Sequence, residues 1–254
     1  MSKPAKIALG VLAILLIVFP IFSNAYTVQV AITTITYSML GLAFAFSMRV
    51  GLPRMDIAAW WGVGGYTTAI LMKNYHMNFW LTALIGGIIA VIIGGLVFSI
   101  AIPRGMMAFF IFCMVLSMAF YQIYGTVKVP FGGWSGIVNI PVPTVGAFEV
   151  IAKRDLYYMG LFFLVLNVVV YYLLYHSKIG RAWDAVGSSL RLARSLGVDV
   201  VKYRMANVLI ANFFIALAGS YFVGYYRAAF PAIFSFAAGL NVMVYLIVGG
   251  FTYS

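Results

Sequence analysis

The chain has 254 residues, of which 65% are hydrophobic and only 8% are charged, and its formal net charge is +11. Soluble domains carry about 25% charged residues, so this composition excludes an ordinary soluble protein and indicates an integral membrane protein. The positive charge does not indicate nucleic-acid binding, because the basic residues flank apolar segments and form no soluble basic face. The single cysteine, Cys113, excludes a disulfide within the chain and a cysteine-based metal site.

Apolar segments recur that reach or approach the roughly 20 residues a helix needs to cross the hydrocarbon core. Short alternating segments of barrel type do not recur, so the predicted fold class is all-α. We expect a polytopic transmembrane helical bundle that forms a single domain over 1–254. The predicted spans, about eight in number, cover residues 7–23, 28–47, 55–72, 79–102, 105–127, 156–175, 205–226 and 236–250. The first span lacks a small-x-small cleavage site, so we interpret it as a retained anchor and not as a signal peptide.

The loops between these spans differ in lysine and arginine content, which is highest in cytoplasmic loops. A cytoplasmic N-terminus places eleven basic residues on that side: Lys3, Lys6, Arg49, Arg54, Arg104, Lys178, Arg181, Arg191, Arg194, Lys202 and Arg204. Five lie outside: Lys73, Lys128, Lys153, Arg154 and Arg227. We therefore predict a cytoplasmic loop at 178–204 and an external loop at 128–155. Spaced glycines and prolines in the external loop predict ordered turns and a docking surface for an external partner.

The third and fourth spans are rich in small residues. In the fourth, Gly86, Ala90 and Gly94 are spaced by four, which permits close helix contact either within the chain or at a subunit interface. The third has glycines in its middle, so it is either a broken or re-entrant helix or a tightly packed continuous one. Broken helices often mark substrate sites in transporters. The candidate substrate-pathway residues are Trp60, Trp61, Gly62, Gly64, Gly65, Tyr66 and Thr67.

Signatures of catalysis are absent from the sequence. There is no phosphate-binding G-x-x-x-x-G-K-[ST], no H-E-x-x-H and no G-x-S-x-G, so we predict no catalytic and no metal-binding residue. The interiors of the spans hold few ionisable groups, which disfavours a proton relay or an ion-coupled carrier. Arg54 and Asp56 are the candidates nearest a span, and they are expected to pair at its cytoplasmic end.

The loop at 178–204 contains an amphipathic pattern. Read as one helix over 183–196, it has an apolar stripe of Trp183, Val186, Leu190, Ala193 and Leu196, and Gly197 is a natural helix stop. Such a helix rests on anionic lipid, packs under the bundle, or fits a groove on a soluble partner.

Several stretches resemble the M-type permease subunits of branched-chain amino acid ABC importers. Residues 180–183 (GRAW), 193–198 (ARSLGV) and 216–219 (ALAG) are similar to the coupling loop of that family and the span after it. Residues 58–69 (AAWWGVGGYTTA), 132–141 (GGWSGIVNIP) and 244–250 (VYLIVGG) resemble three further family stretches, in the same order along the chain. Together the matches extend from about 40 to 250.

The resemblance implies a permease that forms half of a pore with a homologous second permease subunit. Two cytoplasmic ATPase subunits would use ATP and Mg²⁺, so this chain itself needs no cofactor, and an extracytoplasmic solute-binding protein would deliver an amino acid or a similar small polar solute. The location implied is the cytoplasmic membrane of a bacterium or archaeon. The residues implied to couple the pore to the ATPase are Gly180, Arg181, Trp183, Asp184, Val186, Leu190, Ala193, Arg194, Ser195, Leu196 and Gly197.

The sequence departs from the family pattern at three places. Residues 52–56 (LPRMD) replace a Gln-x-Ser-x-Gly-type sequence before the glycine-rich span, and 187–190 (GSSL) lack the acidic residues common after the tryptophan. Family members continue past residue 254, so we expect either a fragment or further spans supplied otherwise. A stand-alone carrier or channel is the alternative function, and a membrane-embedded enzyme would need an ionisable cluster that the sequence lacks.

Overall fold

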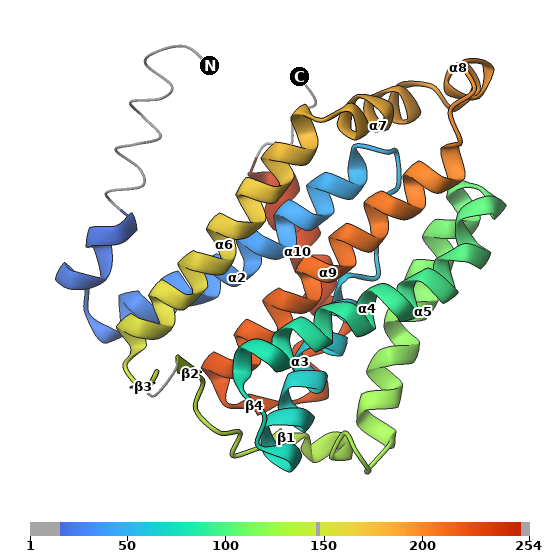
Figure 1. Cartoon of the computed structure of the whole chain (residues 1–254). Helices are drawn as coiled ribbons and strands as arrows, with labels where there is room; N and C mark the ends of the chain where they lie inside the picture. Colours follow the sequence, from blue (N-terminus) through green and yellow to red (C-terminus); the bar gives the residue numbers. More distant parts are fainter. Residues whose placement is uncertain (1–15, 146–147, 250–254) are drawn as a thin grey trace.

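A computed structural model describes residues 16–145 and 148–249, and nearly all of its regular structure is helical (Figure 1). Residues 16–22 form a short helix. The longer elements follow as α2 (Ala25–Met48), α3 (Ile57–Tyr75), α4 (Phe79–Ala101), α5 (Met106–Thr126), α6 (Lys153–His176), α7 (Lys178–Ser188), α8 (Leu190–Ser195), α9 (Val200–Tyr226) and α10 (Phe236–Val248). Three 3₁₀ turns are η1 (Ile102–Arg104), η2 (Gly133–Ser135) and η3 (Pro231–Phe234). The predicted all-α class is confirmed.

Five of the described helices are long and apolar enough to cross a membrane: α2, α4 extended through Arg104, α5, α6 and α9. The protein is therefore a multi-pass membrane protein. The predicted third span corresponds to α3, which has 19 residues, and the predicted eighth to α10, which has 13. Most of the predicted first span, 7–23, lies outside the described residues, so the expected total of eight stays a prediction.

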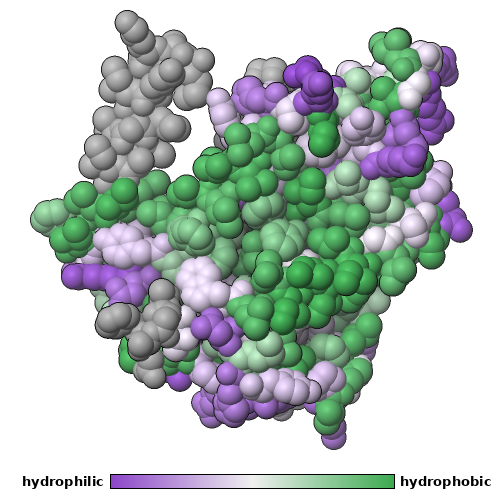
Figure 2. All heavy atoms as spheres, in the orientation of Figure 1, coloured by the Kyte–Doolittle hydropathy of each residue, from purple (hydrophilic) through white to green (hydrophobic). Residues whose placement is uncertain are grey.

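Hydrophilic residues gather at the two ends of the bundle, and a hydrophobic band covers the middle of the face shown in Figure 2. At one end, Arg204 Nε donates to the Val50 carbonyl oxygen at 3.2 Å. At the other, Lys73 Nζ donates to the Val138 carbonyl oxygen at 2.9 Å. The structure therefore places Arg204 and Lys73, one from each predicted set, at opposite ends of the bundle, and the assignment of one end to the cytoplasm stays a prediction.

Helices α3 and α9 form the centre of the bundle, and α4 packs against both. A Cβ added at Gly64 would lie 1.9 Å from the Ala216 carbonyl oxygen, and one at Gly219 would lie 2.0 Å from the Trp61 carbonyl oxygen. A Cβ added at Gly86 of α4 would lie 3.3 Å from the backbone of Gly64, so α4 also approaches α3 closely. Packing without side chains at these crossings is the main attraction between helices in lipid, where the hydrophobic effect adds little. The small-residue face of the fourth span thus serves packing within the chain.

Of the two alternatives for the third span, the structure shows the continuous helix. Helix α3 is continuous from Ile57 to Tyr75, with its glycines inside it. Each glycine lies against another helix or an aromatic ring, as Gly62 does against Tyr124 and Gly65 against Phe234. The glycines are explained by close packing, because backbone hydrogen bonds of the helix persist through them.

Arg54 and Asp56 form an ion pair just before α3, and both side chains are inaccessible to solvent. Arg54 Nε and Nη2 donate to the two carboxylate oxygens of Asp56 at 2.9 and 2.6 Å. Arg54 also donates to Asn212 of α9, and Trp60 Nε1 donates to Asp56. The expected pairing is confirmed, and the pair joins the start of α3 to α9.

Two short antiparallel ribbons form at the end of the bundle opposite α7. Strand β1 (Ile137–Val138) pairs with β4 (Ala228–Ala229), and β2 (Thr144–Val145) pairs with β3 (Phe148–Glu149). Arg227 Nε also donates to the Ile140 carbonyl oxygen at 3.2 Å. The described residues of this loop, 128–145 and 148–155, therefore form ordered structure, as its turn residues predicted.

Candidate functional site

Helices α7 and α8 lie across one end of the bundle (Figure 1), and the chain enters α7 through a tight turn after α6. The Ser177 hydroxyl caps α7 by accepting from the backbone N–H of Gly180 at 3.1 Å. A Cβ at Gly180 would lie 2.3 Å from the Tyr175 carbonyl oxygen. Only glycine therefore allows α7 to fold back directly under the end of α6.

The single helix predicted over 183–196 is wrong in one respect, because the structure has two helices separated at Ser189. Ser189 is extended, and its hydroxyl accepts from the backbone N–H of Leu192 at 3.3 Å, so it caps α8. Serine competes with helix continuation by such local hydrogen bonds. The predicted stop at Gly197 is confirmed: its φ is +77°, and the Val198 N–H donates to the Ala193 carbonyl oxygen in a Schellman arrangement.

The apolar side of α7 packs under the bundle. Trp183 is fully buried, and its Nε1 donates to the Tyr203 carbonyl oxygen of α9 at 2.8 Å. Its ring meets Phe46 of α2 edge-on, with the ring centroids 5.0 Å apart. Val186 and Ala193 are also buried, so of the three interpretations of this stripe, packing on the bundle is the one that the structure shows for these residues.

The end of α2 is tied to α7 by two independent contacts. Arg49 forms an ion pair with Asp184, in which Nη2 donates to Oδ2 at 2.6 Å, and the guanidinium lies 3.5 Å from the ring centroid of Tyr175. A Cβ at Gly187 would lie 2.0 Å from the Arg49 carbonyl oxygen, so the two backbones touch. Helix α7 cannot shift without moving this end of α2 or losing these contacts.

The start of α9 holds the same corner from the other side. Arg204 donates to Val50, as described above, and Asn207 Nδ2 donates to the Phe46 carbonyl oxygen at 3.1 Å. Asp199 caps α9, and the hydrogen bonds from the backbone and side chain of Lys202 hold the pKa of Asp199 below its usual range. Helices α2, α7 and α9 therefore form one packed unit at this end.

The outer side of the α7–α8 pair carries exposed apolar and basic side chains. Leu192 of α8 is 59% exposed, and Leu196, the C-cap of α8, is 69% exposed. Leu190 at the start of α8 is half-buried. Arg191 and Arg194 beside them are exposed as well. Exposed leucines rimmed by charged residues are typical of a surface that binds a protein partner. We call Arg191, Leu192, Arg194, Ser195 and Leu196 the α8 surface.

The residues predicted to line a substrate pathway lie mostly in the interior of the bundle. Trp60 and Trp61 are buried, Trp60 against Phe98 and Trp61 against Phe222. Gly62, Gly64 and Gly65 are buried at helix crossings, as described above.

Tyr66 and Thr67 are placed differently from the other predicted pathway residues. They line an apolar cavity of 320 Å³ between α3, α4 and α5, together with Phe120, Tyr124 and Phe131. The seven predicted residues therefore do not form one lining, and their role in transport stays a prediction.

In the part of the chain that the structure describes, no group of three or more His, Cys, Asp or Glu side chains is close enough together to hold a metal ion.

A family model described as "Branched-chain amino acid transport system / permease component" matches residues 26–253. The matched region includes α2 through α10 with the α7–α8 pair. The chain belongs to this permease family.

Two curated relatives of this permease chain carry the same printed name, "High-affinity branched-chain amino acid transport system permease protein LivM". The one from Escherichia coli strain K12 is 26% identical and the one from Salmonella typhimurium strain LT2 is 25% identical, each over an alignment 274 positions long, gaps included. The alignments cover 96% of this chain and 63% of each relative, so the chain spans less than two thirds of their length. No solved structure matches the chain significantly.

Several residues that hold the permease together at the α7–α8 end were missed by sequence reasoning. Arg49, Arg204 and Asn207 bind partners 135, 154 and 161 residues away along the chain. The only signal in the sequence was the presence of arginine and asparagine at the ends of apolar segments, where such side chains are common anyway. Their partners follow from the three-dimensional packing alone.

Proposed function

We propose that this chain is a permease subunit of an ATP-driven importer of branched-chain amino acids or a similar small polar solute. It forms half of the translocation pore with a homologous permease, and two cytoplasmic ATPase subunits use ATP and Mg²⁺ to drive it. An extracytoplasmic binding protein delivers the solute to the end that carries the loop at 128–155. Membership of the permease family and the names of the two relatives support the solute class.

The α8 surface carries the proposal of ATPase coupling. Leu192 and Leu196 are exposed on α8, which directly follows α7, and Trp183, Gly187 and Arg49 hold α7 against the bundle. A partner that binds these leucines therefore acts on α2 and α9 through α7. Arg191 and Arg194 favour a groove with an acidic rim, because opposite charges orient the encounter.

Co-purification of the ATPase tests this proposal. Leu196→Asp puts a charge in the centre of the proposed contact, so we expect the tagged variant to lose the ATPase subunit that the wild-type chain retains in mild detergent. The loss should correspond to about 2 kcal/mol or more, as for a buried interface anchor. Because Leu196 is 69% exposed, the variant should still fold.

Val129→Asp is the matched control, because Val129 is an equally aliphatic residue, 85% exposed, in the loop at the opposite end. This variant should retain the ATPase. Full retention of the ATPase by Leu196→Asp, or equal loss from both variants, would show that α8 is not the contact.

A further inference from the structure

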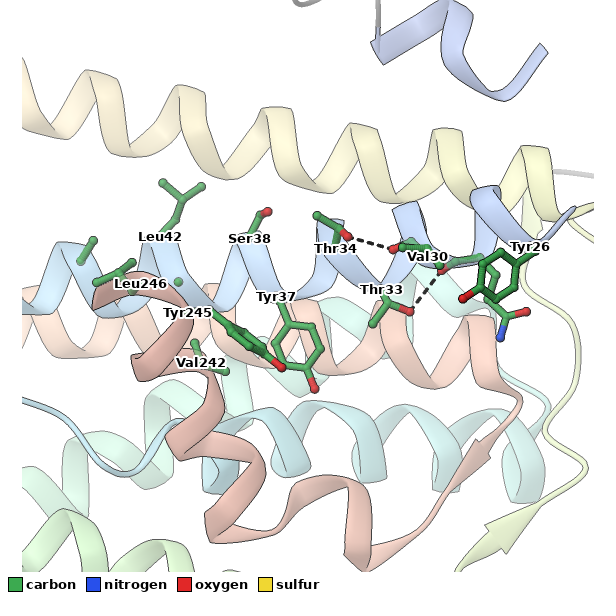
Figure 3. Close-up of a pocket in the computed structure, with 13 residues that line it drawn as sticks. Tyr26, Val30, Thr33, Thr34, Tyr37, Ser38, Leu42, Val242, Tyr245 and Leu246 are labelled. Atoms are coloured by element: carbon green, nitrogen blue, oxygen red, sulfur yellow. Dashed lines mark hydrogen bonds between the residues drawn. The ribbon is translucent and has the colours of Figure 1, made fainter. Parts of the chain in front are cut away.

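A groove of 740 Å³ runs along α2 and is flanked on one side by α10. Its polar lining residues are Tyr26, Gln29, Thr33, Thr34, Tyr37 and Ser38 of α2 and Tyr245 of α10, several of which Figure 3 shows. On α2 these residues are spaced by three and four positions, so they form one stripe on a single face of the helix. We call this surface the α2 groove.

The exposed faces of other long helices carry aliphatic side chains where the α2 groove carries hydroxyl groups. At mid-span they expose aliphatic side chains, such as Ile88 and Ile92 of α4, Val115 of α5, and Val165 and Val169 of α6. Aliphatic faces suit lipid, which offers no hydrogen bonds, whereas polar side chains within spans face the bundle interior or a water-filled cavity. The hydroxyl stripe therefore distinguishes the α2 groove from the lipid-facing surfaces of the same protein.

Two tyrosines meet in the middle of the α2 groove. The rings of Tyr37 and Tyr245 pack edge-on with centroids 5.4 Å apart, and Figure 3 shows their hydroxyl oxygens on the same side. Tyr37 lies at the midpoint of α2, whereas tyrosines in membrane helices usually lie at the interface with water. The side chains of Tyr37, Tyr245 and Ser38 all line the groove. These groups are positioned to bind a polar molecule or water inside the membrane.

The rest of the lining sets the class of molecule that fits. Thr33 and Thr34 donate to the Gln29 and Val30 carbonyl oxygens at 3.1 and 2.9 Å (Figure 3), which leaves their oxygen lone pairs as acceptors. No Asp, Glu, Lys or Arg side chain lines the groove among the described residues. Aliphatic side chains, among them Leu246, supply an apolar wall. The groove thus suits a small solute without net charge that carries both polar and aliphatic groups.

We propose that the α2 groove is a solute-binding part of the translocation pathway and takes a small neutral or zwitterionic solute. This rests on the proposed permease function and assigns its pathway to α2 and α10. The same helix α2 ends at Arg49, where Asp184 and Gly187 of α7 hold it. A movement of α7 is therefore transmitted along one continuous helix to the groove.

Thiol labelling in whole membranes containing the complete transporter tests the groove. The chain has one cysteine, Cys113, which is fully buried, so the wild-type chain should not react with a membrane-impermeant cationic thiol reagent. We expect Ser38→Cys to react, because Ser38 is exposed in the groove. A mixture of the neutral standard amino acids without cysteine, whose own thiol would consume the reagent, should slow this reaction by about fivefold, as expected for competition with bound solute.

Val165→Cys is the matched control, because Val165 lies at the middle of α6 and is 52% exposed on an aliphatic face. It should not react, since lipid excludes the reagent. The proposal is overturned if Ser38→Cys is unreactive, if amino acids do not slow its reaction, or if it forms a disulfide between two copies in place of reacting. A disulfide would show that the groove is covered by a second permease.

Tyr37→Phe tests the same site without an introduced cysteine. It removes one hydroxyl and keeps the ring, so the KM for uptake should rise about fivefold with little change in the amount of complex. Tyr172→Phe, at an exposed tyrosine of α6, should leave KM unchanged. An unchanged KM for Tyr37→Phe would contradict the proposal. If the ATPase does not co-purify with the wild-type chain, that result contradicts the proposed permease function instead. The labelling of Ser38→Cys is read independently of that co-purification.

Discussion

Arg54 and Asp56 illustrate how single residues in this bundle depend on their partners. Removing two charges from water costs several kcal/mol each, which their mutual attraction and further hydrogen bonds offset. Asp56 accepts from Arg54 and Trp60, and Arg54 also reaches Asn212, so the charges are almost fully satisfied. The pair therefore contributes little net stability, but each member strongly needs the other.

A double replacement tests this dependence. Arg54→Met should lower the free energy of unfolding by about 3–5 kcal/mol, because it leaves the Asp56 carboxylate buried and unpaired. Arg54→Met combined with Asp56→Leu should recover most of that loss, since no buried charge remains. Thermal unfolding of the purified chain in detergent measures both variants, and a double variant no more stable than Arg54→Met would refute the explanation.

Element by element, periodicity and composition predicted the long helices well, and local exceptions poorly. The apolar runs located α2, α4, α5, α6 and α9, because a span must satisfy its own backbone and therefore has a characteristic length. The glycines of α3 were compatible with a broken or a continuous helix, and small residues of α9, such as Ala216 and Gly219, settle the matter. The break at Ser189 was missed because the apolar pattern continues across it.

The contact between α7 and α2 should transmit ATPase movement. Gly187→Ala places a Cβ 2.0 Å from the Arg49 carbonyl oxygen and forces the two elements apart. We expect the complex to keep hydrolysing ATP while uptake falls by about tenfold or more, because the contact aligns the moving parts. Ser188→Ala, on an exposed neighbour, is the control and should leave both rates near wild type. Equal uptake by the two variants would count against transmission through this contact.

At the scale of the molecule, the chain is a bundle centred on α3 and α9, with an α7–α8 pair at one end and a loop with ordered described residues at the other. The fold class and the family resemblance followed from the sequence, because composition and short motifs are local. The predicted pathway did not emerge as one lining: Trp60 and Trp61 pack in the interior, and only Tyr66 and Thr67 border a cavity. Which residues face a shared pore depends on how helices are rotated, and one sequence does not specify this.

ATP-driven uptake by proteoliposomes tests the central claim, that this chain is a permease moved by a separate ATPase. Radiolabelled leucine uptake is measured with the chain alone, with the complete complex, and with the complex carrying Leu196→Asp. The account predicts uptake only by the complete wild-type complex supplied with ATP, and close to none for the variant. Uptake by the chain alone without ATP, or undiminished ATP-driven uptake with Leu196→Asp, would contradict it.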